Sequence, residues 1–233
     1  MKYKTIMMAR VFWCFLACLL TGMVAAQDAT VSVRTMQLGG DALPESWVMV
    51  KGEKEPVIVD WLTSQPSQPL NVIHDGQLRL LRYSTNAAGE RTLEVAKLIK
   101  LPVGANEVLL LAWMSDGQER YVVIKDHFLK AKFNDWLVIN TSSNPVALLA
   151  GEKAKPLRLD AGKSAVFQPN IQEGKGVKIL AQAQRNEEVR TFLSSYWPAF
   201  PGQRTMIIFY DDGEKMRARR IGDRFLPKKK EEE

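Results

Sequence analysis

The stretch EVLLLAWMSDGQERYVVIK, residues 107–125, contains two apolar segments separated by Asp116-Gly117. A tight turn requires positive φ angles, which Gly accepts freely and Asp tolerates, so this pattern predicts a β-hairpin. Short segments of the same kind recur along the chain at a spacing typical of a β-sandwich. We therefore expect an all-β protein with an immunoglobulin-like outline. One segment, residues 189–197, also fits a helical period through Val189, Phe192 and Leu193.

The sequence contains an internal duplication. Asp116-Gly117 matches Asp212-Gly213 at a shift of 96 residues, and residues 124–129 match 221–226 at a shift of 97. Upstream, SWVMV at residues 46–50 matches DWLVI at 135–139, at a shift of 89. Because the matches occur in the same order, they predict two copies of one unit. We expect tandem sandwiches at residues 46–129 and 135–226, joined by a short linker near residues 130–134.

Two further segments lie outside these copies. Residues 27–45 form an N-terminal segment in which the strand candidate 30–38, with Val31 and Val33 alternating, is expected to pair with a sheet edge. Residues 227–233 form a charged tail without apolar side chains, which we expect to be disordered.

The start of the chain has the order of a secretory signal peptide. Lys2, Lys4 and Arg10 precede an apolar run over residues 11–24, which is shorter than a membrane-spanning helix. Small residues up to Ala26 predict removal of residues 1–26, and an uncleaved anchor is the alternative. We expect an exported protein, periplasmic or extracellular, in a Gram-negative bacterium.

Both cysteines, Cys14 and Cys18, lie inside this apolar run, where lipidation of Cys18 is a second alternative. After cleavage the chain would therefore have neither disulfides nor a thiolate metal site. Cleavage removes three basic residues and no acidic ones, so the formal net charge falls from +6 to +3. This near balance, together with export, argues against a nucleic-acid partner, and no transmembrane segment remains.

The sequence offers little that could catalyse a reaction. His74 and His127 are the only histidines, and no nucleophile elbow, phosphate-binding glycine loop or metal-spaced histidine pair occurs. The adjacent acids Asp211 and Asp212 would point to opposite faces of a strand, where they cannot form a glycosidase pair. We therefore predict a non-enzymatic protein without a cofactor or metal.

Two groups of residues are candidates for partner contacts. In the last strand Lys215, Arg217 and Arg219 share one face, and Arg220 follows them. This basic strand is interpreted either as an edge protected against aggregation or as a contact for an anionic partner such as an envelope polymer or protein. The second group is Tyr196-Trp197, because exposed aromatic faces bind sugars; burial of these rings against the linker or the domain junction is the alternative. The aromatic pairs Trp47 with Trp136 and Trp113 with Phe209, by contrast, are expected to fill the cores, at corresponding positions in the two copies.

The sequence resembles two families of exported proteins. Residues 137–140 and 144–146 resemble the opening of the second domain of periplasmic pilus-assembly chaperones, over about ten residues. The donor strand and basic anchors of those chaperones have no counterpart, so no functional residue is transferred. The whole chain is more similar to the uncharacterised secreted tandem β-sandwich proteins of Gram-negative bacteria. The leading hypothesis is a binding or structural module acting through loops or an edge strand. The alternative is a chaperone that captures an extended peptide by strand addition.

Overall fold

The computed structural model describes residues 29–39, 41–86, 89–126, 135–151, 154–169, 175–185, 188–198, 203–213 and 215–224. The expected signal peptide, the linker at 130–134, His127 and the charged tail lie outside these ranges. The described part is all-β, with sixteen strands arranged in four four-stranded sheets. None of its segments is a helix long and apolar enough to cross a membrane.

Unit 1 is a sandwich of two sheets. Its outer sheet 1 has the order β3-β2-β5-β6 and its inner sheet 1 the order β4-β1-β7-β8. The strands are β1 (Ala29–Gln37), β2 (Trp47–Val48), β3 (Val57–Ile58), β4 (Leu70–His74), β5 (Gln77–Thr85), β6 (Arg91–Lys100), β7 (Glu107–Ser115) and β8 (Gln118–Lys125).

Unit 2 repeats this arrangement strand for strand. Its outer sheet 2 has the order β11-β10-β13-β14 and its inner sheet 2 the order β12-β9-β15-β16. The strands are β9 (Trp136–Asn140), β10 (Val146–Ala150), β11 (Leu157–Leu159), β12 (Ser164–Phe167), β13 (Gly176–Arg185), β14 (Glu188–Pro198), β15 (Gln203–Asp212) and β16 (Lys215–Arg224).

The correspondence between the units extends to irregular features. In each inner sheet the first strand of the unit runs parallel to the seventh, β1 to β7 and β9 to β15. In each outer sheet the long hairpin has one register shift, between Leu80 and Leu81 in unit 1 and between Ala181 and Gln182 in unit 2. The prediction of two tandem sandwiches arising by duplication is therefore confirmed.

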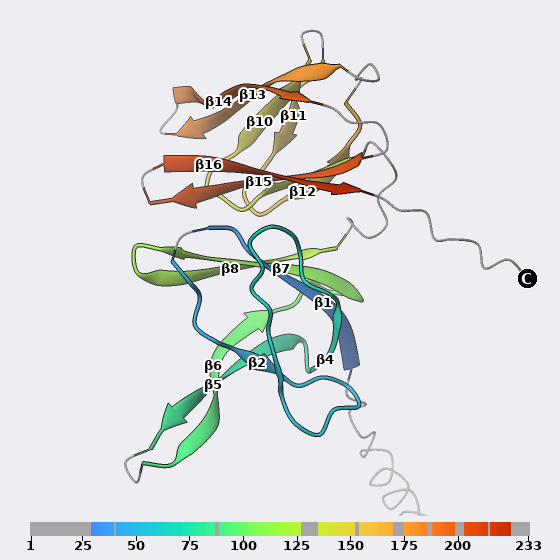
Figure 1. Ribbon diagram of the computed structural model, residues 1–233. Coiled ribbons are helices and arrows are strands. Elements are labelled where there is room, and N and C mark those ends of the chain that lie inside the picture. Colours follow the sequence, from blue (N-terminus) through green and yellow to red (C-terminus); the bar gives the residue numbers. More distant parts are fainter. Residues whose placement is uncertain are drawn as a thin grey trace, which may run out of the picture.

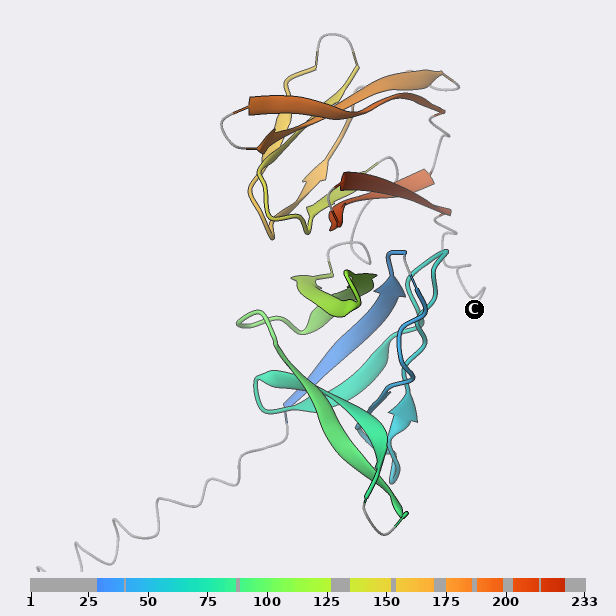
Figure 2. The same ribbon diagram turned by 90° about the vertical axis from the view of Figure 1, so that its left-hand side faces the viewer.

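The four sheets form one stack, with the two inner sheets face to face (Figures 1 and 2). Three apolar cores fill the three gaps: one inside unit 1, one between the units and one inside unit 2. The inner sheets are consequently buried on both faces, and all five residues of β9 are buried. This explains why residues 108–113, VLLLAW, are continuously apolar instead of alternating.

The core between the units is built from equivalent faces of the two inner sheets. Leu109 pairs with Ile124 and Met206 pairs with Ile221, so a shift of 97 residues relates the two hairpins. All four of these residues lie in the inter-unit core. A contact in which each side presents the same patch is isologous, as in a two-fold dimer, and here it occurs within one chain.

This register corrects two details of the sequence alignment. Trp113 corresponds to Tyr210 and not to Phe209, because a one-residue slip in a strand moves every side chain to the opposite face. Trp113 accordingly lies in the inter-unit core and Phe209 inside unit 2. Trp47 and Trp136 do not correspond either, since Trp47 belongs to β2 of an outer sheet and Trp136 to β9 of an inner sheet.

The N-terminal strand also differs from its predicted place. Residues 30–38 do form a strand, β1, but β1 lies between β4 and β7 inside the inner sheet. The prediction that it pairs with a sheet edge as an addition to both copies is wrong, because β1 is the counterpart of β9. Residues 189–197, for which a helical period was possible, lie in strand β14, paired with β13.

Candidate functional site

The predicted basic strand is β16, the edge strand of inner sheet 2. Lys215 and Arg217 on this strand are exposed, and the Nε of Arg217 donates to Asp212 Oδ2 at 3.2 Å. These two side chains remain accessible to a partner.

Arg219, on the same strand, binds the other unit. Its guanidinium donates to the backbone carbonyl oxygens of Gln37, Leu38 and Thr63, all in unit 1. Arg219 therefore connects the edge of inner sheet 2 to the end of β1 and to the loop after β3.

Arg220 faces the interior of unit 2. Its Nη2 donates to the carbonyl oxygen of Pro198 at 2.8 Å, and its guanidinium carbon lies 5.4 Å from the ring centroid of Trp197. Burial lowers the pKa of this guanidinium. The contacts of Arg220 close the gap between β14 and β16 at the side of the unit 2 core.

Tyr196 and Trp197 point to opposite faces of β14. Trp197 packs against the unit 2 core, with its ring centroid 6.1 Å from that of Trp136. Tyr196 is 65% exposed and pairs across the strands with Lys178 on the outer face. The structure therefore separates these two rings, and only Tyr196 is presented to solvent.

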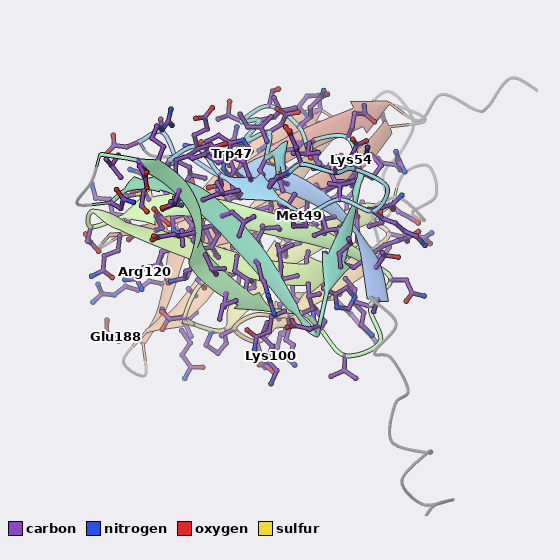
Figure 3. The ribbon with its side chains drawn as sticks, turned by 90° about the horizontal axis from the view of Figure 1, so that it is seen from below. Trp47, Met49, Lys54, Lys100, Arg120 and Glu188 are labelled. Carbon is purple, nitrogen blue, oxygen red and sulfur yellow. The ribbon has the colours of Figure 1, made fainter. Side chains whose placement is uncertain are left out.

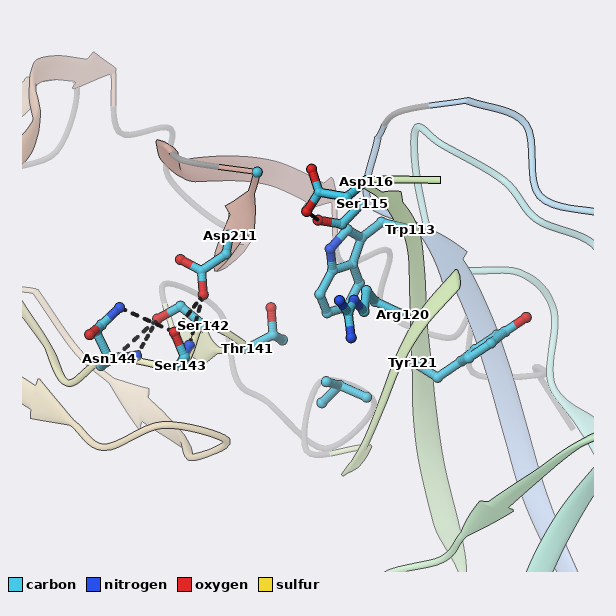
Figure 4. A pocket seen from close by; sticks show the side chains of 12 residues that line it. Trp113, Ser115, Asp116, Arg120, Tyr121, Thr141, Ser142, Ser143, Asn144 and Asp211 are labelled. Carbon is cyan, nitrogen blue, oxygen red and sulfur yellow. Dashed lines mark hydrogen bonds between the residues drawn. The ribbon is translucent and has the colours of Figure 1, made fainter. Parts of the chain in front are cut away.

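A polar cleft lies between the units, where the hairpin turns of the inner sheets meet (Figure 4). Its volume is about 610 Å³, within the range of ligand pockets. Unit 1 contributes the end of β7, the turn after it and β8, while unit 2 contributes the loop after β9 and the end of β15. The lining residues that carry the chemistry are Trp113, Ser115, Asp116, Arg120, Thr141, Ser143, Asn144 and Asp211.

The unit 2 wall of the cleft is held by its own hydrogen bonds. Asp211 Oδ2 accepts from the backbone N–H of Ser143 at 2.8 Å and from its hydroxyl at 3.0 Å. Thr141 donates from its hydroxyl to the carbonyl oxygen of Phe209 at 2.9 Å. Below the loop, the amide of Asn140 donates to the carbonyl oxygens of Asn144 and Leu159. The loop thus presents polar atoms in a fixed arrangement, which lowers the entropic cost of binding a ligand.

The unit 1 wall presents a cation and an aromatic ring. Arg120 is exposed, and among the described residues its guanidinium makes no hydrogen bond or ion pair. Trp113 lies beside it with only 5% of its surface exposed. Figure 4 shows Arg120 and Trp113 on one side of the cleft and Asp211 with Ser143 on the other.

Asp116 has an unusual backbone for a residue with a side chain. Its φ is 52°, in the left-handed region, and its equivalent in unit 2 is Gly213 with φ 58°. Asp tolerates this conformation less well than Gly, so a carboxylate is kept at the rim of the cleft where glycine would be less strained. Ser115 donates from its hydroxyl to this carboxylate at 3.3 Å.

The two units are similar, but the cleft occurs on one side of their contact and not at the equivalent place on the other side. The segment after β1 is the unit 1 counterpart of the loop after β9, and its Leu38 carbonyl accepts from Arg219. A Cβ on Gly39 of that segment would lie 3.4 Å from the hydroxyl of Tyr210, the equivalent of Trp113. The region equivalent to the cleft is thus occupied by the chain itself, and the space remains open on the Trp113 side.

His74, Asp211 and Asp212, for which no catalytic role was expected, make hydrogen bonds within the protein. His74 Nδ1 accepts from the backbone N–H of Gly76 at 2.9 Å in an exposed turn. Asp211 binds Ser143 while Asp212 pairs with Arg217, so the two acids point apart as expected. Among the described residues, no group of three or more His, Cys, Asp or Glu side chains could hold a metal ion.

Sequence reasoning missed the cleft, because its walls come from segments far apart in the chain. The available signal in the sequence was a run of four polar residues, Thr141, Ser142, Ser143 and Asn144, close after the apolar segment 136–139.

No protein-family model matches the chain, and no curated protein matches it. Among solved structures it is similar to a "putative cell adhesion protein" from Bacteroides ovatus, at 11% identity, with a TM-score of 0.28. This similarity covers 86% of this chain and 99% of the other.

Proposed function

We propose that this protein is an exported, non-enzymatic binding module that holds a hydroxyl-rich ligand, of the glycan class, in the cleft between its two units. The observation that carries the proposal is the Arg120 side chain, which faces the cleft without a partner among the described residues, opposite a loop of fixed hydrogen-bonding groups. The loops at this cleft fit the expectation that affinity comes from loops on a β-sheet scaffold.

The chemistry of the walls favours sugar hydroxyls. Asp116 and Asp211 supply carboxylate acceptors, Arg120 supplies donors, and the hydroxyl of Ser143, which donates to Asp211, can accept. A hydroxyl group donates and accepts, so a polyol can satisfy both kinds of wall at once. An anionic ligand would meet two carboxylates and a single cation, and an apolar ligand would leave these polar groups unpaired.

The arrangement offers no support for catalysis. Asp211 already accepts two hydrogen bonds from Ser143, and Asp116 lies exposed at a turn. Neither carboxylate has the apolar surroundings that prepare a general acid. Strand addition is also disfavoured at β16, since Lys215 and Arg217 place charges along that edge.

Isothermal titration with soluble envelope oligosaccharides tests the proposal. The probes are a lipopolysaccharide core oligosaccharide, a peptidoglycan disaccharide-peptide and a neutral maltooligosaccharide, and the protein is purified after export. Arg120→Ala should weaken binding of the best probe at least about tenfold, the cost of one charge-assisted hydrogen bond.

The duplication provides a matched control. Arg217 is the equivalent of Arg120 in unit 2 and lies outside the lining of the cleft. Arg217→Ala should leave the affinity unchanged. Equal losses in both variants would show nonspecific charge attraction, and absence of binding for all three probes would refute a glycan ligand; either result overturns the proposal.

A further inference from the structure

The outer face of unit 1, on the side of outer sheet 1 away from its core, carries a row of apolar side chains. The row crosses this face from strand to strand: Ile58 on β3 pairs with Trp47 on β2, Trp47 with Leu81 on β5, and Leu81 with Val95 on β6. Tyr83 extends the row, with its ring centroid 4.9 Å from that of Trp47. Figure 3 views the molecule from this side and labels Trp47 and Met49.

Burial within the chain does not account for these residues. The unit 1 core lies on the opposite side of the sheet and is filled from it by Val48, Leu78 and Leu80. Ile58 is 45% exposed and Val95 is 50% exposed. A contiguous apolar face of this kind on an exported protein indicates an interaction surface.

The positions of unit 2 that are equivalent to this row carry different side chains. The register shift in each long hairpin fixes the equivalence: Leu81 and Gln182 are the first residues after it. Gln182 pairs with Ala147, Ala147 with Arg158, and Gln182 with Thr191. The row of Ile58, Trp47, Leu81 and Val95 in unit 1 is therefore Arg158, Ala147, Gln182 and Thr191 in unit 2.

Tyr83 follows the same rule, since its equivalent two residues further along the hairpin is Gln184. The row is thus apolar on the outer face of unit 1, and the equivalent positions of unit 2 are polar, although Val189 and Tyr196 are exposed on that face as well. The difference lies in side chains on the side of the sheet away from the unit 1 core.

We propose that the outer face of unit 1 binds the same face of a second copy of this chain, which extends the stack of sheets across a two-fold axis. The chain already joins sheets face to face in this way, because its own inter-unit core is formed by equivalent apolar faces. Cross-strand rows of aromatic and branched side chains pack well on a copy of themselves in such contacts.

Symmetry limits the assembly to two copies. A head-to-tail contact would place the apolar row against Arg158 and Lys178 on the outer face of unit 2, leaving those charges unpaired. Contact between two unit 1 faces instead closes the assembly, and the outer faces of unit 2, with Arg158 and Lys178, lie at both ends. Arg79 and its ion-pair partner Asp75 lie at the margin of the face, so opposite charges can meet across a two-fold axis.

Light scattering coupled to size-exclusion chromatography tests this proposal. The exported protein should have the mass of two chains down to about 1 µM, as expected for a stable interface. Ile58→Arg, which copies unit 2, should raise the dissociation constant at least about 30-fold, because it places a charge within the apolar row. Arg158→Ala, at the equivalent position of unit 2, should leave the mass unchanged.

A second variant keeps the test independent of folding. Val95→Thr with Tyr83→Gln also copies unit 2 and changes only solvent-facing side chains, so its far-UV circular dichroism should match that of the parent while the dimer weakens. A single-chain mass at all concentrations, or a dimer that survives both variants, would overturn the proposal. The glycan titrations at the cleft are unaffected by either result.

Discussion

Trp113 of unit 1 and Tyr210 of unit 2 occupy equivalent positions, and their rings meet edge to face across the inter-unit core with centroids 6.3 Å apart. Edge-to-face pairs of this kind stabilise beyond their buried area. The turns beyond them also meet, since Asp116 Oδ1 lies 3.6 Å from the position that a Cβ on Gly213 would occupy. The two units are therefore halves of one body and not independent domains on a linker.

The shared core predicts a single unfolding transition. Leu111 is fully buried between the units, so Leu111→Ala should lower the free energy of unfolding by about 2–5 kcal/mol. Urea unfolding followed by tryptophan fluorescence and circular dichroism measures the number of transitions and the free energy of unfolding. Leu62→Ala, at an exposed leucine, should change stability by less than about 0.5 kcal/mol. Two separated transitions in the parent protein would contradict this prediction.

Arg219 should contribute to the joining of the two units. Arg219→Ala removes charged donors to the carbonyl oxygens of Gln37 and Leu38, with an expected cost of about 1–3 kcal/mol. Arg217→Ala is the neighbouring control, because its ion pair with Asp212 is exposed and exposed pairs contribute about 0–1 kcal/mol. Chemical denaturation measures both variants, and equal costs would mean that Arg219 has no special role.

The buried ion pair of unit 1 should be sensitive to the loss of one partner. Arg34 Nε donates to Asp126 Oδ2 at 2.7 Å, and Asp126 is 3% exposed. Asp126→Ala leaves the guanidinium buried without this carboxylate and should cost about 3–5 kcal/mol.

The equivalent of Arg34 in unit 2 is Leu137, so the fold accepts an apolar side chain at this position. The double variant Arg34→Leu with Asp126→Ala should therefore be more stable than Asp126→Ala alone. Thermal unfolding of the three proteins compares them, and a double variant that is less stable than the single one would refute this account.

Tyr121 should make stability fall at high pH. Burial, followed by its hydrogen bond to Glu119, raises the pKa of Tyr121 to about 12. Because the unfolded chain releases this proton near pH 10, the stabilisation is complete below pH 10 and is lost as the pH rises towards 12.

Tyr121→Phe should flatten the decline in stability between pH 10 and 12, while the Arg82–Glu119 ion pair at 2.7 Å stays in place. Urea midpoints measured across this range test the sign. Ultraviolet titration of the native protein should also lose its component near pH 12. Identical pH profiles for the parent and the variant would show that Tyr121 does not cause the decline.

The sequence predicted what depends on local pattern. The apolar segments of residues 107–125 around Asp116-Gly117 indicated a hairpin, and the match to residues 221–226 indicated a second copy. Both hold in the structure, because turn chemistry and strand patterns are local properties. The alignment of the two hairpins was wrong by one residue at Trp113. Both turns contain Asp-Gly, and aligning the hairpins on this dipeptide shifts one strand by one residue relative to the other.

The sequence by itself determined the all-β class, the duplication, and the absence of cysteine from residues 27–233. Tertiary structure alone decided that β1 lies inside a sheet, that the units share a core, that Arg219 is used internally while Arg120 is not, and that a cleft opens beside Trp113. The physical reason is that burial on both faces of a sheet, and contacts between residues far apart in the chain such as Trp113 and Tyr210, depend on how whole sheets stack. A single strand pattern does not encode this stacking.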